Sequence, residues 1–257
     1  PLVFMLFGII ARGTAFTFRN YDAVKDRWQN VYTLIFYYAS LLTPFFLGLI
    51  AASTISKSIN PYAKTFQDLY IFSWLNWFGV SVGIFAVSLC AYLASVFSLR
   101  TLGDKMELNL MIKKSYEMIV FVLVSGILVF AAAYFSGIPL IKWVFSKPLG
   151  IAAITLATVA LLFVLKALRD KKMVAVRVLA GFQIIMILVA ATYQHNPNIL
   201  LFADGSHLSL TEHIAAPKTI TTLAWALMLG SVFILPFLFY LMFSFSNVKK
   251  MIDKKIK

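Results

Sequence analysis

The three histidines are the side chains best suited to hold haem iron or a metal ion. His195, His207 and His213 all fall in one long connection, residues 195–219, and the apolar runs contain none. Haem in a helical bundle is normally ligated by His or Met side chains that project from the helices. The separations of twelve and six residues match no zinc-binding pattern. We therefore expect no catalytic residue, no cofactor-binding residue and no metal ligand on this chain, and we interpret its methionines as packing residues.

Two other side chains with chemical potential stand in apolar runs. Cys90 is the only cysteine, and an apolar environment disfavours the reactive thiolate, so a buried structural thiol is expected. Glu117 follows Lys113 and Lys114 at the start of a run and has two interpretations, a proton-relay carboxylate or a side chain that reaches the membrane surface beside the lysines. The second interpretation is favoured.

The composition identifies the solvent in which these residues must fold. Of 257 residues, 61% are hydrophobic and 13% are charged, and the mean hydropathy is +0.87. Soluble domains are about 45–50% apolar and about 25% charged. The net charge of +13 comes from short basic clusters between long apolar runs, which is typical of membrane topology and not of nucleic-acid binding. The composition therefore predicts a polytopic membrane protein.

Seven apolar runs approach the roughly 20 residues that a membrane helix needs. They do not alternate with period two, so an all-α transmembrane helix bundle is expected and a β-barrel is excluded. Residues 1–257 are interpreted as one transmembrane domain, and because the chain opens inside an apolar run we expect an upstream segment to be missing. The predicted spans lie near 1–18, 31–54, 69–98, 116–136, 149–167, 174–194 and 220–245.

The basic residues also predict an orientation. Most Lys and Arg side chains fall in residues 12–27, 100–114, 166–177 and 249–257, which seven spans would place on one side of the membrane. Cytoplasmic connections carry such an excess of positive charge. We therefore expect residue 1 outside the cytoplasm and the C-terminal tail inside it, with membrane lipids as contacts.

Small and amide side chains predict close helix packing. Gly79 and Gly83 form a small-xxx-small pair, a spacing that lets helix backbones approach each other in membranes. Asn76 and Gln183 are amides within predicted spans, and each needs a hydrogen-bond partner, for which another helix is the expected source. These features indicate helix association and name no partner.

One motif resembles a known family. Residues 12–19 read Arg-Gly-Thr-Ala-Phe-Thr-Phe-Arg, which resembles the Arg-Gly-x-Ala-Phe-x-Phe-Arg signature of subunit II of cytochrome bd-type quinol oxidases. Weaker similarities follow in the family's order, at residues 26–30, 75–83, 93–102 and 214–219. The resemblance runs over essentially the whole chain.

The resemblance implies a fold and a role. Members of this family carry nine spans, so the seven here would be the last seven. The implied role is that of a haem-free subunit II, which supports assembly and stability of a subunit I that holds haems b and d, oxidises quinol and reduces oxygen to water. The implied location is the bacterial cytoplasmic membrane, as a heterodimer. The quinone used, a bound lipid or structural quinone, and small single-span accessory subunits are left open.

Two threonines depart from the family pattern. Thr17 and Thr33 stand where family members usually have an acidic residue, and a hydroxyl cannot carry a proton as a carboxylic acid does. Arg12 and Arg19 have two interpretations, support of a cytoplasmic proton entrance or contact with lipid headgroups. Headgroup contact is favoured.

A stand-alone transporter or channel is the alternative function. It would show ionisable residues or broken helices near the middle of the membrane, often in paired repeats. No clear repeat is found, and Pro44 and Pro236 do not form an obvious pair.

Overall fold

The computed structural model describes residues 1–21, 28–99, 105–211 and 215–255, and for residues 105, 242 and 245–255 it describes the backbone alone. Within these residues, seven helices are long and apolar enough to cross a membrane, which confirms the predicted fold class and the number of spans. They are α1 (Leu2–Tyr21), α2 (Trp28–Ile55), α4 (Trp77–Ser98), α5 (Lys105–Phe135), α7 (Pro148–Arg169), α8 (Met173–Thr192) and α9 (Pro217–Lys255).

The remaining described elements are short and lie between the long helices. Helix α3 (Phe66–Tyr70) follows α2, and α6 (Leu140–Phe145) follows α5. Strands β1 (Asn198–Leu201) and β2 (His207–Ser209) pair antiparallel after α8. Residues 209–212 resemble a capping box, which predicts a short surface helix. Ser209 instead ends β2, and Glu212 lies outside the described residues.

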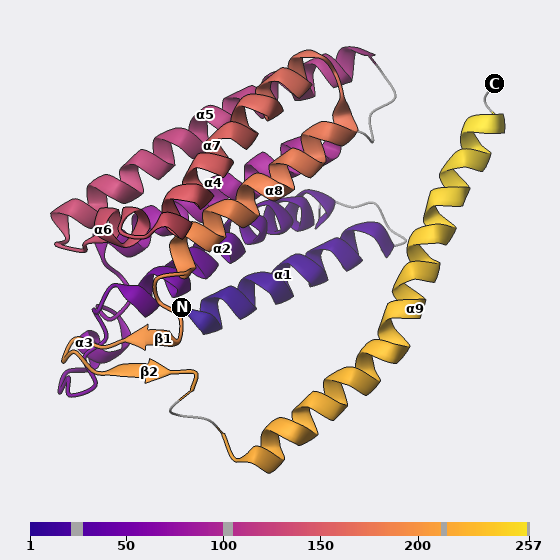
Figure 1. The fold of residues 1–257 in the computed structure, drawn as a ribbon. Coiled ribbons are helices and arrows are strands. Elements are labelled where there is room, and N and C mark those ends of the chain that lie inside the picture. The colour runs from indigo at the N-terminus through magenta and orange to yellow at the C-terminus, as the bar shows by residue number, and fades with distance from the viewer. Residues whose placement is uncertain (22–27, 100–104, 212–214, 256–257) are drawn as a thin grey trace. The chain divides into compact units, whose positions relative to one another are not determined.

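Contacts divide the described chain into two units, Pro1–Ser209 and Leu210–Lys257. In the first unit α4, α5, α7 and α8 run side by side, α2 packs on α4, and α1 packs on α2 (Figure 1). The second unit is essentially α9, which carries apolar residues around its whole circumference over Pro217–Leu241, as a membrane-spanning helix does. The prediction of one transmembrane domain stays a prediction.

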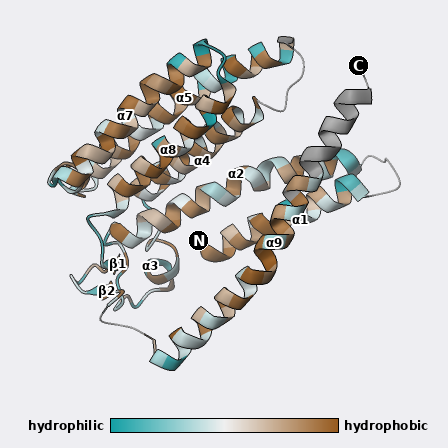
Figure 2. Cartoon of the chain, turned by 45° about the vertical axis from the view of Figure 1, so that its right-hand side comes forward, coloured by the Kyte–Doolittle hydropathy of each residue, from teal (hydrophilic) through white to brown (hydrophobic). Residues whose placement is uncertain are grey.

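The core of the first unit is the four-helix bundle α4, α5, α7 and α8. Its centre is a cluster of buried side chains from all four helices, among them Tyr92, Val96, Ile119, Val164 and Val176. Apolar residues also cover the outward faces of the helices, while hydrophilic residues collect at helix ends and connections (Figure 2). The helices are therefore apolar inside and outside, which suits a hydrocarbon solvent.

The third predicted span begins too early in the chain. It was expected near 69–98, but α4 begins at Trp77, because the Asn76 side chain accepts a hydrogen bond of 2.6 Å from the Gly79 amide and caps the helix. Asn76 is thus an N-cap, and its interpretation as an amide bonded to another helix is wrong. The residues before it form α3 and a turn, where the Thr65 side chain caps α3.

The fourth predicted span begins too late. It was expected near 116–136, but α5 begins at Lys105, because the exposed polar residues at its start remain helical without being apolar. The other five helices begin and end close to the predicted boundaries, except that α9 continues to Lys255. Cys90 is exposed on α4, so the expectation of a buried thiol is wrong; its side chain points away from the bundle core.

Candidate functional site

The motif residues of α1 face the start of α2. Arg12 and Arg19 are seven residues apart, which places them on one face of α1 at an axial separation of about 10 Å. Both side chains are exposed. The Arg12 guanidinium carbon lies 5.3 Å from the ring centroid of Phe36 on α2, a distance at which the ring face attracts the cation. Arg12 therefore links the two helices and is not simply a solvated charge.

The Arg19 end of α1 is tied to α2 through the backbone and aromatic rings. The Gln29 amide nitrogen Nε2 donates a 3.3 Å hydrogen bond to the Arg19 carbonyl oxygen. The rings of Phe18 and Tyr32 stack with centroids 5.8 Å apart. Arg19 also lies in the last turn of α1, where a cation interacts favourably with the helix dipole.

Thr17 and Thr33 form hydrogen bonds within their own helices. The Thr17 hydroxyl donates to the Gly13 carbonyl at 3.0 Å, and the Thr33 hydroxyl donates to the Gln29 carbonyl at 2.8 Å. Both are i to i−4 bonds of the kind Ser and Thr make inside helices. Neither position offers a carboxylic acid for proton transfer.

Most described carboxylates lie near helix ends or in connections, whereas Glu117 lies within the first half of α5. Glu117 forms an exposed salt bridge of 2.7 Å with Lys114, which agrees with the favoured interpretation of this residue. Asp170 follows α7 and lies 3.8 Å from Lys172. The other described acidic side chains are Asp68, Glu107 and Asp204, whereas Asp22, Asp26, Asp104 and Glu212 lie outside the described residues.

The histidines lie beyond the C-terminal end of α8. His195 meets the Trp143 ring edge-on, with centroids 4.7 Å apart, and its half-buried position lowers the pKa of the imidazole. His207 begins β2, and His213 lies outside the described residues. Among the described residues, no three His, Cys, Asp or Glu side chains come together as a metal site.

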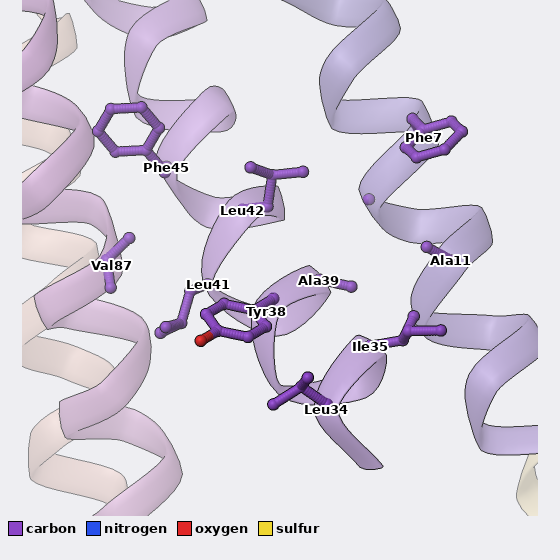
Figure 3. A pocket seen from close by; sticks show the side chains of 11 residues that line it. Phe7, Ala11, Leu34, Ile35, Tyr38, Ala39, Leu41, Leu42, Phe45 and Val87 are labelled. Atoms are coloured by element: carbon purple, nitrogen blue, oxygen red, sulfur yellow. The ribbon is translucent and has the colours of Figure 1, made fainter. Parts of the chain in front are cut away.

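An apolar groove of about 480 Å³ lies on α2, with α1 and α4 as its walls (Figure 3). Gly8 and Ala11 of α1, Leu34 and Tyr38 of α2 and Val87 of α4 are among the lining residues. The Tyr38 hydroxyl is the only polar side-chain group that lines it, and no lining residue is His, Met or Cys. This groove therefore does not fit a haem, which would need an axial ligand.

The predicted glycine pair lies where α4 meets α2 and its own N-terminal turn. A Cβ atom on Gly83 would lie 2.7 Å from the Phe45 ring of α2, and one on Gly79 would lie 2.8 Å from the Trp74 carbonyl oxygen. The sequence analysis missed Gly48, whose added Cβ would lie 2.8 Å from the Gly83 Cα atom. The spacing Gly48-x-x-x-Ala52 on α2 is also a small-xxx-small pair, so the sequence did carry a signal for it.

Two polar contacts join the bundle helices. The Tyr92 hydroxyl donates to Gln183 Oε1 at 3.1 Å, linking α4 to α8, which confirms the interhelical hydrogen bond expected for Gln183. The hydroxyls of Ser88 and Ser125 lie 2.8 Å apart and link α4 to α5. The sequence analysis did not identify Tyr92, Ser88 or Ser125, since an isolated Ser or Tyr in an apolar run gives no signal of its partner.

The whole chain was also compared with known proteins. Residues 1–245 match the protein-family model described as cytochrome bd terminal oxidase subunit II. No curated protein shows significant similarity to the chain. The match includes the motif at residues 12–19 and all seven apolar stretches. Of the other stretches that carry the resemblance, residues 26–27, 100–102 and 214 lie outside the described residues.

Proposed function

The chain belongs to the cytochrome bd terminal oxidase subunit II family, and from this premise we propose that it is a haem-free subunit that supports assembly and stability of a haem-bearing subunit I. That partner would hold haems b and d, oxidise quinol and reduce oxygen to water. The family match over residues 1–245 is the observation that carries the proposal. No residue of this chain is assigned a catalytic role.

The side chains of the described helices support a haem-free role. The groove on α2 is lined by no His, Met or Cys, and the described histidines follow α8 and lie in the connection before α9. No reaction step is therefore assigned to haem on this chain.

The exposed faces of the first helices support a heterodimer. Only Gly8 and Ala15 are buried among the 20 residues of α1. Phe7, Phe16 and Phe18 expose more than half of their surface, which lipid or a partner subunit would cover in the membrane. We assign part of this apolar surface to contact with subunit I and part to lipid.

We propose a bacterial cytoplasmic membrane location, as the resemblance implies, and the ends of the helices support an orientation with the basic end inside. Lys166 and Arg169 lie in the last turn of α7, and Lys113 and Lys114 lie in the third turn of α5, whose Asn109 is hydrogen-bonded to Lys171 in the α7–α8 connection. An excess of Lys and Arg marks the cytoplasmic face of membrane proteins. This orientation places the C-terminal tail in the cytoplasm.

We assign Arg12 and Arg19 to contact with lipid headgroups at that face, in preference to a proton entrance. Thr17 and Thr33, the nearby positions where relatives are acidic, bond their own helices and offer no acid. Arg12→Gln and Arg19→Gln are expected to lower the amount of complex in the membrane, while turnover per haem changes less than about twofold. A large loss of turnover at normal complex abundance would instead support the proton entrance.

Purification of the tagged chain from its own membranes tests the proposed function. We expect a haem-bearing subunit to copurify, with spectra of haems b and d and quinol-dependent oxygen uptake. A chain isolated without such a partner, or one that alone carries substrate flux in liposomes, would contradict the proposal and favour a transporter or channel.

A further inference from the structure

The groove on α2 has the shape and lining of a site for a hydrocarbon chain. Phe7 and Ala11 on α1, Leu34 and Phe45 on α2 and Val87 on α4 surround it, and all of these side chains are apolar (Figure 3). On α2 the lining runs from Leu34 to Phe45, an axial length of about 16 Å. This is about half of the roughly 30 Å hydrocarbon core, the depth of one leaflet.

A positive charge stands at one end of the groove. Leu34 and Ala11 line this end, and Arg12 follows Ala11 on α1. The guanidinium of Arg12 lies 5.3 Å from the Phe36 ring centroid. Among the residues that the structure describes, no carboxylate lies within ion-pair distance of Arg12.

The length of α2 places this charge near the membrane interface. Its 28 residues span about 42 Å, about 12 Å more than the hydrocarbon core. We assign the core to the 20 residues from Phe36 to Ile55, because the polar residues Ser56 and Lys57 follow directly, and this assignment leaves Trp28 and the following turns in the interfacial layer. Arg12, beside Phe36, therefore lies at the depth of the phosphate and glycerol groups of that leaflet.

From this geometry we propose that the groove binds one acyl chain of an anionic phospholipid whose phosphate pairs with Arg12. The apolar walls remove the chain from contact with other lipids, and the guanidinium supplies the charge-assisted hydrogen bonds that phosphate favours. The lone Tyr38 hydroxyl is the one polar side-chain group available to the glycerol ester region. This proposal rests on the assignment of Arg12 to headgroup contact and does not depend on the chain's role in an oxidase.

Native mass spectrometry of the purified complex tests the site. The complex is exchanged into detergent micelles that contain phosphatidylglycerol or phosphatidylcholine with the same acyl chains, and the lipid retained on this subunit is measured. We expect one tightly retained phosphatidylglycerol and weaker retention of phosphatidylcholine. Arg12→Gln should weaken phosphatidylglycerol retention about fivefold, and Arg12→Lys should largely preserve it. Ala11→Leu fills the groove and should reduce retention of both lipids.

Matched variants outside the groove serve as controls. Lys166→Gln removes an exposed charge on α7, and Ala131→Leu adds the same bulk to an exposed position on α5; both should retain lipid as the unaltered chain does. Equal retention of the two lipids, or full retention by Arg12→Gln, would overturn the proposal. A retained isoprenoid quinone without phosphorus, or a groove with no lipid because a helix covers it, would overturn it as well. Lipid retention is read without oxidase turnover, so failure of the proposed function is detected separately.

Discussion

Gly48 of α2 and Gly83 of α4 lie directly against each other. A Cβ atom on Gly48 would stand 2.8 Å from the Gly83 Cα atom and 2.7 Å from the Val82 carbonyl oxygen. Real Cβ atoms do not approach other atoms so closely, so the contact requires two residues without side chains. Small residues at such crossings let helices pack through their backbones, which is a main source of helix association in membranes. This contact joins α2 to the four-helix bundle.

Gly48→Ala and Gly83→Ala should therefore each destabilise the protein, by about 1–3 kcal/mol, because the added methyl group overpacks the crossing. The measurement is the thermal unfolding midpoint of the purified complex. Gly181→Ala on α8 is the matched control, since its added Cβ would meet nothing within 4 Å. That control should be neutral or slightly stabilising through helix propensity. An unchanged midpoint in both crossing variants would contradict the close contact.

The hydrogen bond between Tyr92 and Gln183 should show energetic coupling. Tyr92 is 2% exposed and Gln183 is 7% exposed, so removal of the hydroxyl by Tyr92→Phe leaves a buried amide oxygen without its donor. We expect a loss of about 1 kcal/mol, because interhelical hydrogen bonds in membranes contribute modestly. The free energy of unfolding of Tyr92→Phe, Gln183→Leu and the double variant checks this value in a double-mutant cycle.

The double variant should be more stable than the sum of the two single losses predicts, since it leaves neither partner unsatisfied. Tyr134→Phe provides the control, because Tyr134 is 75% exposed on α5 and its hydroxyl is not in the core. Additive losses in the cycle would mean that the bond does not contribute to stability.

The spans were predictable because membrane helices depend on long apolar runs, a property of the local sequence. The boundaries were less predictable where polar residues decide them. The Asn76 side chain caps α4, so this helix begins at Trp77 and the apolar residues before Asn76 are not part of it. Lys105 and the residues after it extend α5 with polar turns. The sequence of residues 198–209 did not predict strands, because the paired strands β1 and β2 are short and their pairing is irregular, with a register shift between Asn198 and Leu200.

The contacts between helices could be predicted only in part. Gln183 is a polar residue in an apolar run, which indicates that its side chain needs a hydrogen-bond partner. The identity of that partner, Tyr92, depends on which helices pack against each other. Cys90 was misplaced because apolar runs in membranes carry no periodic contrast between the bundle side and the lipid side. The groove beside Arg12 has no sequence signal, since three separate helices create it.

Arg177 should stabilise the end of α4 from α8. Its guanidinium donates a hydrogen bond to the Phe97 carbonyl oxygen and lies 5.5 Å from the centroid of the Phe97 ring. A cation at a helix C-terminus satisfies a carbonyl that lacks an intrahelical partner and interacts favourably with the helix dipole. Arg177→Gln should therefore lower the free energy of unfolding by about 1 kcal/mol. Arg177→Lys keeps the charge but not the planar stacking and should give an intermediate loss in the same measurement.

His195 should make the end of the bundle sensitive to pH. Burial against Trp143 lowers the pKa of His195 below its usual value of 6.5, so the folded protein favours the neutral imidazole. The unfolded chain binds the proton more readily, and the stability contributed by neutral His195 is therefore complete above pH 6.5 and lost as the pH falls below that value. Lowering the pH from about 7.5 to about 5.5 should reduce the thermal unfolding midpoint more for the unaltered chain than for His195→Phe, which keeps an aromatic ring beside Trp143 but cannot titrate. An identical pH response of His195→Phe and the unaltered chain would show that the imidazole is not the titrating group, because only its protonation distinguishes the two proteins at this contact.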